Sequence, residues 1–175
     1  MSDDRDIEYL TQAYELAAEY SSDPSTQLAA LIVKDGELIS WGVNNFPRGV
    51  QETPSRWIRP LKYEFVEHAE RNAVYAAARD GVATEGGVMY CPWAACADCA
   101  RAIIQSGIIE VVTHAFPFSI WKTRDGMKNW NESMKITEQM FIEAGIKFRI
   151  IDEPLLRPVT LTFNGEPHNI PSKAL

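Results

Sequence analysis

The chain has 175 residues, of which 46% are hydrophobic and 23% charged, as is typical of one globular domain with a sizeable core. The formal net charge of −7 argues against non-specific binding to long nucleic acid, which depends on clustered Lys and Arg. The longest apolar runs, such as residues 28–33, are far shorter than the roughly 18 residues of a membrane span. Because the acidic N-terminus also lacks the features of a secretory signal, we expect a cytoplasmic protein with a small-molecule substrate.

The first predicted elements are an amphipathic helix and a β-hairpin. Ile7, Leu10 and Tyr14 recur at helical spacing, and this helix should end before Asp23-Pro24. Two apolar, partly β-branched runs at residues 28–34 and 37–43 are joined by Asp35-Gly36, which suits a tight hairpin turn. Residues 44–62 are rich in Pro, Gly and Arg and have no period, so they predict a long loop.

The next part of the chain alternates between helices and strands. Helices are predicted at residues 68–80, 97–106 and 131–143, each followed by a glycine that can end it, and strands at residues 87–91, 108–114 and 146–151. Together these elements predict a three-layer α/β/α domain over residues 1–151, with a central mixed sheet of about five strands. Residues 152–175 predict an irregular tail, with a possible extra strand at 159–163 or a contact within an oligomer.

Three residues in a spaced pattern predict a metal site. His68-Ala69-Glu70 is followed, after 25 residues, by Cys96-Ala97-Asp98-Cys99, which is close to the signature of zinc-dependent deaminases. A Cys-x-x-Cys at the start of a helix directs two thiolates toward one ion, and the helix N-terminus favours their negative charge. One imidazole and two thiolates leave the fourth tetrahedral position of Zn²⁺ for water, as in catalytic sites. We therefore predict a zinc site at His68, Cys96 and Cys99.

Glu70 is predicted to move protons at this site. It lies two residues after His68, so it can be near the metal without binding it. The expected reaction is addition of water to C4 of a cytosine ring, with proton delivery to N3 and to the departing amine. A structural zinc site is the alternative, and Cys91 would then be its fourth ligand, although this residue also fits a buried strand position.

A wider set of motifs resembles the cytidine deaminase superfamily and, within it, the deoxycytidylate (dCMP) deaminases, over about residues 23–148. The resemblance is carried by Asp23-Pro24 with Gln27, by the run Gly-Val-Asn-Asn-Phe-Pro-Arg-Gly at 42–49, and by residues 59–70 and 99–108. It implies a cytidine-deaminase-like fold, hydrolysis of dCMP to dUMP with release of ammonia, and a homo-oligomer such as a hexamer.

The resemblance also implies roles for single residues. Asn44 matches the residue that hydrogen-bonds the sugar, and the backbone of Ala69 matches the contact to the pyrimidine carbonyl. Ala95 stands where the family usually has Pro before the first zinc cysteine, which bears on loop rigidity. Asn45 replaces a Gly in a loop that belongs to the effector site of regulated members, so control by dCTP and dTTP is left open.

A nucleotide substrate also needs cations for its phosphate and a surface for its base. Trp93, three residues before Cys96, is placed either to line the base pocket or to pack in the core. Two alternatives stay open: deamination of another cytosine nucleotide, such as dCTP or a modified dCMP, and a non-catalytic, zinc-stabilised nucleotide-binding module. The candidate cations are Arg48, Arg56, Arg59, Lys62, Lys122 and Arg124.

Overall fold

The computed structural model describes residues 4–121 and 128–173. Within these ranges, no helix has the length and apolar character needed to cross a membrane. In chain order the helices and strands are α1 (Asp4–Tyr20), β1 (Ala29–Lys34), β2 (Glu37–Val43), η1 (Pro54–Trp57), α2 (Lys62–Phe65), α3 (Ala69–Asp80), β3 (Val88–Tyr90), α4 (Ala97–Gln105), β4 (Glu110–His114), α5 (Phe116–Trp121), α6 (Lys128–Ala144), β5 (Lys147–Ile151), β6 (Val159–Phe163) and β7 (Glu166–Ile170).

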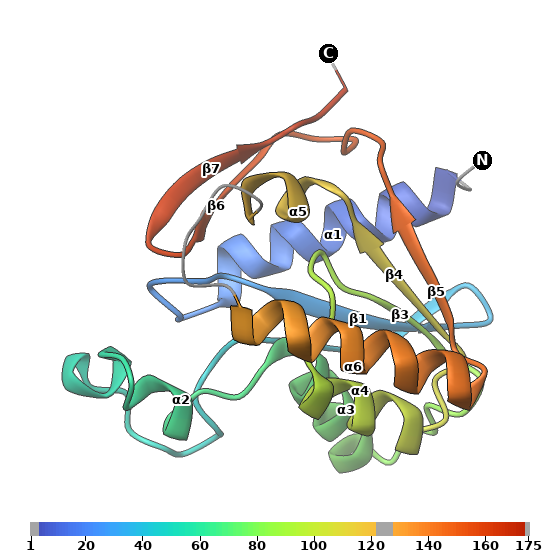
Figure 1. The fold of residues 1–175 in the computed structure, drawn as a ribbon, viewed down its shortest axis with the longest axis horizontal. Coiled ribbons are helices and arrows are strands. Elements are labelled where there is room, and N and C mark those ends of the chain that lie inside the picture. The colour runs from blue at the N-terminus through green and yellow to red at the C-terminus, as the bar shows by residue number, and fades with distance from the viewer. Residues whose placement is uncertain (1–3, 122–127, 174–175) are drawn as a thin grey trace.

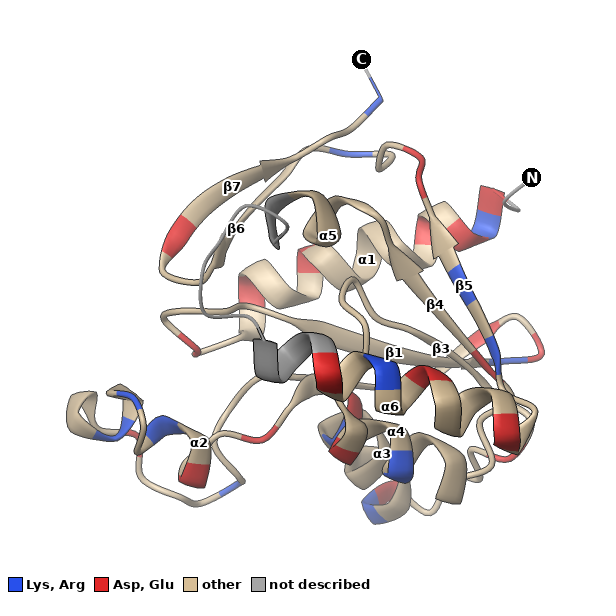
Figure 2. Ribbon diagram, in the orientation of Figure 1, with Lys and Arg blue, Asp and Glu red and all other residues tan. Residues whose placement is uncertain are grey.

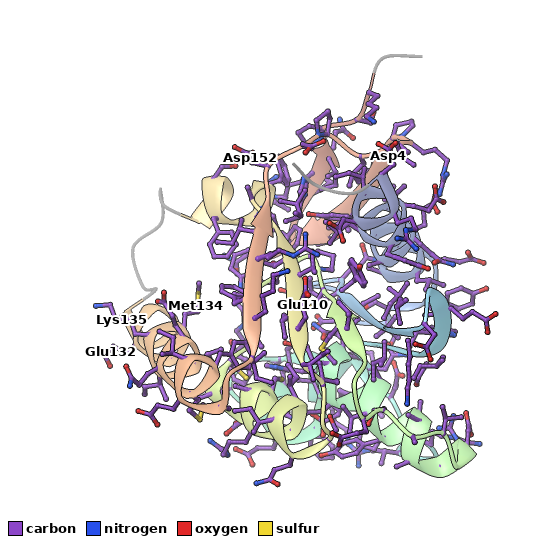
Figure 3. All side chains as sticks on the ribbon, turned by 90° about the vertical axis from the view of Figure 1, so that its right-hand side faces the viewer. Asp4, Glu110, Glu132, Met134, Lys135 and Asp152 are labelled. Atoms are coloured by element: carbon purple, nitrogen blue, oxygen red, sulfur yellow. The ribbon has the colours of Figure 1, made fainter. Side chains whose placement is uncertain are left out.

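The centre of the fold is a five-stranded mixed sheet with the order β2-β1-β3-β4-β5. β1 pairs antiparallel with β2 and β3, whereas β3, β4 and β5 run parallel to one another. The β1–β2 turn is tight because Asp35 and Gly36 both have positive φ angles, 54° and 81°. α1 lies on one face of the sheet, and α3, α4 and α6 lie on the other (Figures 1 and 3). The predicted three-layer α/β/α fold is therefore confirmed.

Close packing between α3 and β2 fixes the position of the first predicted zinc ligand. A side chain on Gly42 would collide with the backbone of Asn72 and Ala73, so only glycine lets the strand approach the helix this closely. Ala73 and Ala77 are fully buried at the same contact. As a result, the N-terminal end of α3, with His68 as its N-cap, lies directly beside the residues that follow β2.

An ionic network fixes α1 across the other end of the sheet. Arg149 on β5 donates hydrogen bonds to Asp6 Oδ2 at 2.6 Å and to Glu110, the first residue of β4. The Tyr90 hydroxyl donates to Asp6 Oδ1 at 2.9 Å. Glu110 is the first residue of β4, whereas Arg149 lies in the middle of β5 and Tyr90 is the last residue of β3, so the network extends from the start of β4 along the sheet.

The structure differs from the prediction mainly in its short elements. The possible strand at 159–163 is β6, but the segment expected to be an irregular tail also contains β7, and the two form a hairpin. β7 has the sequence Glu-Pro-His-Asn-Ile, which is poor in β-branched residues and gives little strand signal. The predicted loop at 44–62 includes η1 and the start of α2, and α5 was not predicted, because helices of four to six residues are too short to show a period.

Candidate metal centre and active site

The three predicted metal ligands converge at the N-terminal ends of two helices. His68 is the N-cap of α3, Cys96 is the N-cap of α4, and Cys99 lies in the first turn of α4. Their ligand atoms all lie within 4.8 Å of one another, with His68 Nδ1 3.6 Å from Cys96 Sγ and 3.5 Å from Cys99 Sγ. One nitrogen and two sulfurs at this spacing, facing the positive ends of two helix dipoles, fit a Zn²⁺ ion.

The two thiols of the cluster have opposite pKa shifts. A hydrogen bond from Cys99, together with His68, lowers the pKa of Cys96 to about 4. The same hydrogen bond, with burial, raises the pKa of Cys99, so this thiol keeps its proton. Burial lowers the pKa of His68, but the hydrogen bond to Cys96 and the charge of Glu70 outweigh it, and the net direction is upward. The protons held here must leave when a metal binds.

Glu70 lies in the first turn of α3, next to the cluster but not part of it. Its side chain is buried. Burial raises the pKa of the Glu70 carboxyl, and the charge of His68 only partly opposes this shift. A carboxyl whose pKa is raised by burial holds a proton more readily than an exposed one, which suits a group that must both accept and return a proton.

Cys91, the alternative fourth ligand, does not belong to the cluster. Among the described residues, the group that can hold a metal consists of His68, Cys96 and Cys99. Cys91 is buried just after β3, where its backbone N–H donates to the Val112 carbonyl at 3.0 Å. Burial raises the pKa of its thiol, so it stays protonated. This placement agrees with the buried strand position that the sequence also allowed.

Arg71 and Glu67 support the cluster from outside, and sequence reasoning did not identify them. Arg71 Nη1 donates to Cys99 Sγ at 3.5 Å, and the guanidinium also forms an ion pair with Glu67. The Glu67 carboxylate in turn accepts the His68 backbone N–H at 2.9 Å. The signal that could have found them is their i, i+4 spacing around His68, which places both side chains on the same side of the helix start.

Two hydroxyls of α6 hold the loop that carries Cys96. Thr137 Oγ1 donates to the Ala95 carbonyl at 2.9 Å, and the Ala97 N–H donates to Ser133 Oγ at 2.9 Å. Ala95 is the position where the resemblance predicted a proline. These two hydrogen bonds restrain the backbone on both sides of Cys96, so the loop is anchored without the proline ring.

The two residues predicted to touch the sugar and the base contact each other. Asn44 is buried, and its Oδ1 accepts the Ala69 backbone N–H at 2.9 Å while its Nδ2 donates to the Thr26 carbonyl at 3.0 Å. The neighbouring Asn45 Oδ1 accepts the Ser22 N–H at 2.7 Å. Both asparagines therefore connect the end of α1 and the segment after it with the residues around His68.

Trp93 is a core residue at the edge of the site. Its side chain is 4% exposed and its ring lies between those of Phe118 and Phe163, with centroids 5.8 and 5.7 Å away. Of the two roles that the sequence allowed, lining the base pocket or packing in the core, the structure shows Trp93 packed in the core. Phe163 belongs to β6, so the C-terminal hairpin contacts the loop that leads to Cys96, three residues before this cysteine.

The candidate cations differ in whether their charge is already neutralised. Figure 2 shows basic positions along the segment around α2. Lys62 is buried and paired with Asp23 at 2.6 Å, and Arg56 stacks over the Phe65 ring. Arg48 is exposed and has no ion-pair partner among the described residues. Arg59 donates to the neutral amide of Asn164; Lys122 and Arg124 lie outside the described residues.

Comparison with known proteins places this site in a family. Residues 3–115 match the family model of the cytidine and deoxycytidylate deaminase zinc-binding region, and the chain belongs to this family. It is similar to the deoxycytidylate deaminase of Homo sapiens, with 34% identity over 149 residues, 81% of this chain and 77% of that protein. A deaminase from the luxG 3′ region of Aliivibrio fischeri is 35% identical over 136 residues, 78% of this chain and 86% of that protein.

A solved structure has the same fold. The dCMP deaminase of the cyanophage S-TIM5, crystallised with dCMP and dUMP, matches 86% of this chain and 99% of its own with a TM-score of 0.64. The two sequences are 22% identical, so this likeness concerns the fold alone. The resemblance read from the motifs, and the fold class that it implied, are thereby confirmed.

Proposed function

We propose that this chain is a zinc-dependent deaminase that hydrolyses dCMP to dUMP and ammonia. The observation that carries the proposal is the convergence of His68, Cys96 and Cys99 beside a buried carboxyl, Glu70. Relatives named deoxycytidylate deaminase, similar over about four fifths of the chain, support dCMP as the substrate.

The proposed reaction assigns one task to each residue. His68, Cys96 and Cys99 hold the zinc, which when bound polarises a water and lowers the pKa of that water toward neutrality. Glu70 takes a proton from the water and delivers it to N3 of the cytosine ring. As the water oxygen bonds to C4, Glu70 carries the second proton of that water to the amine; the C4–N bond then breaks, ammonia leaves and the oxygen remains as the new carbonyl. The base is thereby converted to uracil.

The substrate contacts follow from the loops around His68. Asn44 Oδ1 has a second lone pair, so it can accept a sugar hydroxyl while it holds the Ala69 N–H. The same Ala69 N–H can also donate to the pyrimidine carbonyl in a bifurcated hydrogen bond, while Trp93 packs in the core beside the loop that leads to Cys96. The exposed Arg48 adds positive charge that attracts an anionic substrate to an otherwise acidic protein.

The test is a substrate panel combined with one conservative substitution. The purified protein is incubated with dCMP, dCTP, deoxycytidine and cytosine, with zinc content measured in parallel. Glu70→Gln should keep the metal and lower kcat for dCMP by at least about a hundredfold, because it removes the proton carrier. Glu138→Gln, an exposed position on α6, is the control and should keep full activity.

Each alternative predicts a different result in this panel. Faster turnover of dCTP than of dCMP would indicate another nucleotide substrate. Bound zinc without turnover of any cytosine compound would indicate the non-catalytic module and contradict the proposal. Adding dCTP and dTTP to the dCMP assay tests effector control, which Asn45 left open.

A further inference from the structure

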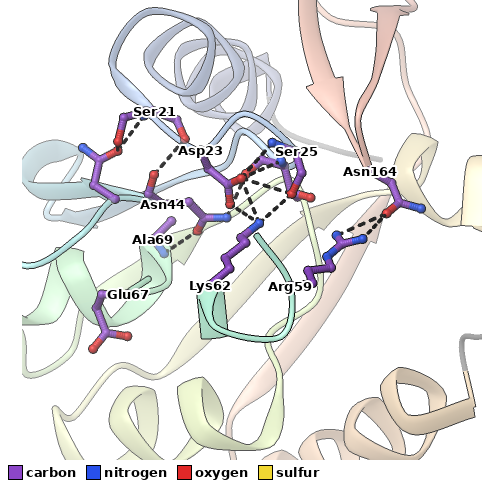
Figure 4. A network of polar contacts seen from close by, with 12 residues as sticks. Ser21, Asp23, Ser25, Asn44, Arg59, Lys62, Glu67, Ala69 and Asn164 are labelled. Atoms are coloured by element: carbon purple, nitrogen blue, oxygen red, sulfur yellow. Dashed lines mark hydrogen bonds and ion pairs between the residues drawn. The ribbon is translucent and has the colours of Figure 1, made fainter. Parts of the chain in front are cut away.

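The turn between β6 and β7 touches two segments of the candidate site that are far apart in sequence. Phe163, before the turn, packs against Trp93 in the loop that leads to Cys96. The next residue, Asn164, accepts hydrogen bonds from Arg59 Nη1 and Nη2 at 3.2 and 3.3 Å (Figure 4). One turn thus connects the loop of the zinc cysteines with the loop before His68. The family match ends at residue 115 and does not include this hairpin.

The hairpin turn is itself firmly held. The Gly165 N–H donates to the Ser25 carbonyl at 2.8 Å, and Gln27 and Thr162 exchange two hydrogen bonds at 2.9 and 2.7 Å. Asn164 and Gly165 have φ angles of 52° and 84°, the positive values of a two-residue hairpin turn that Asn-Gly suits best. The Asn164 amide therefore presents its oxygen to Arg59 from a fixed position.

Lys62 is paired with a carboxylate, whereas Arg59 has no carboxylate partner among the described residues. Lys62 Nζ pairs with Asp23 Oδ2 at 2.6 Å and donates to Ser25 Oγ at 2.6 Å, so its charge is cancelled inside the protein (Figure 4). Within residues 4–121 and 128–173, Arg59 contacts the Asn164 amide and the Tyr63 ring but no carboxylate. A guanidinium has five N–H donors, and the amide accepts only two, so donors remain for a planar, bidentate contact with a phosphate.

We propose that Arg59 binds the 5′-phosphate of the substrate and that Asn164 is a positioning residue that holds Arg59 for this contact. The inference rests on the proposed function, because it assumes that the base lies at the His68, Cys96 and Cys99 cluster. Phe163 then contacts Trp93 near the place of the base, and Asn164 contacts Arg59 at the place of the phosphate. These two neighbouring residues therefore connect the two parts of the substrate site. The C-terminal hairpin sets the preference for a nucleotide over a nucleoside.

The test compares a ligand with and without its phosphate. Asn164→Gly keeps the positive φ angle but removes the amide; Asn164→Asp keeps the contact but neutralises Arg59; Arg59→Met removes the cation. Each variant should raise KM for dCMP at least about tenfold, because a charged hydrogen bond to the phosphate is lost. The kcat for dCMP and the turnover of deoxycytidine should not change.

The control variant is Asn169→Ala, on the exposed side of β7, which should leave KM for dCMP unchanged. The Arg59→Met/Asn164→Gly double variant should be no worse than Arg59→Met, because both act through one contact.

Binding of the products dUMP and deoxyuridine, measured by calorimetry, tests the inference without any turnover. The wild type should bind dUMP more tightly than deoxyuridine, and Arg59→Met and Asn164→Gly should remove most of that difference. Equal losses for both ligands, or no loss for dUMP, would overturn the role of Arg59 and Asn164. A wild type that binds dUMP selectively but does not deaminate dCMP would overturn the proposed function alone.

Discussion

Arg71 lies outside the ligand set but contacts one of its sulfur atoms directly. Its guanidinium donates to Cys99 Sγ and is held in place by Glu67, which also fixes the His68 backbone. A cation beside a thiolate stabilises the deprotonated form that binds metal, and supporting hydrogen bonds of this kind orient the ligand. Arg71 therefore contacts a sulfur of the cluster directly, and Glu67 contacts the backbone of His68.

We expect Arg71→Met to weaken zinc binding by about ten- to a hundredfold, because it keeps the aliphatic stem but removes the charge and the donor. Competition with a chromogenic chelator measures the zinc Kd. Arg79→Met is the matched control, since Arg79 lies on the same helix but pairs with Asp80 at an exposed position. Equal zinc affinity in the two variants would show that Arg71 only packs beside the cluster.

Some residues of the candidate site could be predicted from the sequence and others could not. His68, Cys96 and Cys99 could be predicted because metal ligands need fixed residue types at spacings set by two helix starts, and Glu70 because it follows His68 by two residues. Arg71 and Asn164 could not be named, because their roles depend on which partner the fold brings within hydrogen-bond distance. Asn164 reaches Arg59 across more than a hundred residues of chain, and no local pattern encodes such a contact.

At the scale of elements, α1 and β4 are connected by a buried histidine. His114 Nε2 lies 2.9 Å from the Glu153 carbonyl, which can only accept, so Nε2 carries the proton. Nδ1 is then an acceptor and receives the Tyr14 hydroxyl at 2.9 Å. These roles are those of a neutral ring, and burial favours the neutral ring because it lowers the pKa of His114 in the folded state. The helix, the strand and the segment after β5 thus share one uncharged contact.

The pH dependence of stability should carry the signature of His114. Its folded pKa is below the ordinary value of 6.5, so its contribution is complete above pH 6.5 and is lost as the pH falls below it. The free energy of unfolding should then fall by up to about 1.4 kcal/mol per pH unit from this residue. Urea unfolding of wild type and His114→Gln between pH 8 and pH 5 measures the difference, in which groups common to both proteins cancel. Parallel curves for the two proteins would refute this assignment.

Elements with a long, regular pattern were the ones that could be predicted. α1 buries Ile7, Leu10 and Tyr14, the residues whose spacing predicted it, and the Asp35-Gly36 turn fixed the β1–β2 pair. β7 could not be predicted because its strand character comes from pairing with β6 and not from its own residues. The β6–β7 hairpin lies beside α1, and its position depends on contacts between residues far apart in sequence, such as the bridge between Thr26 and Phe163.

At the scale of the whole molecule, the segment around α2 exposes apolar side chains at its surface. Ile58, Leu61 and Tyr63 are 65%, 44% and 52% exposed, although they lie within six residues of one another. Beneath them, Phe46 packs against Trp57 and Phe65, which gives the segment a core of its own. Apolar residues gathered on a surface of this kind are typical of contacts between subunits.

We expect this segment to contribute to the homo-oligomer that the family resemblance predicts. Ile58→Glu combined with Leu61→Glu should lower the molar mass in solution, because a charge at a subunit contact is costly to bury. Light scattering after size-exclusion chromatography measures the mass, and Ile142→Glu, an equally exposed apolar position on α6, is the control. An unchanged mass for the double variant would exclude the segment from any interface.

The contact between Asn164 and Arg59 also has a consequence for biosynthesis. Ribosomes make the chain from the N-terminus, so residues 68–99 emerge before residues 159–170. The metal cluster can therefore assemble on the nascent chain while Arg59 still lacks the amide that holds it. Under the inference drawn above, a chain at this stage would have an intact metal centre but an unfinished phosphate end, and discrimination between nucleotide and nucleoside would be acquired last.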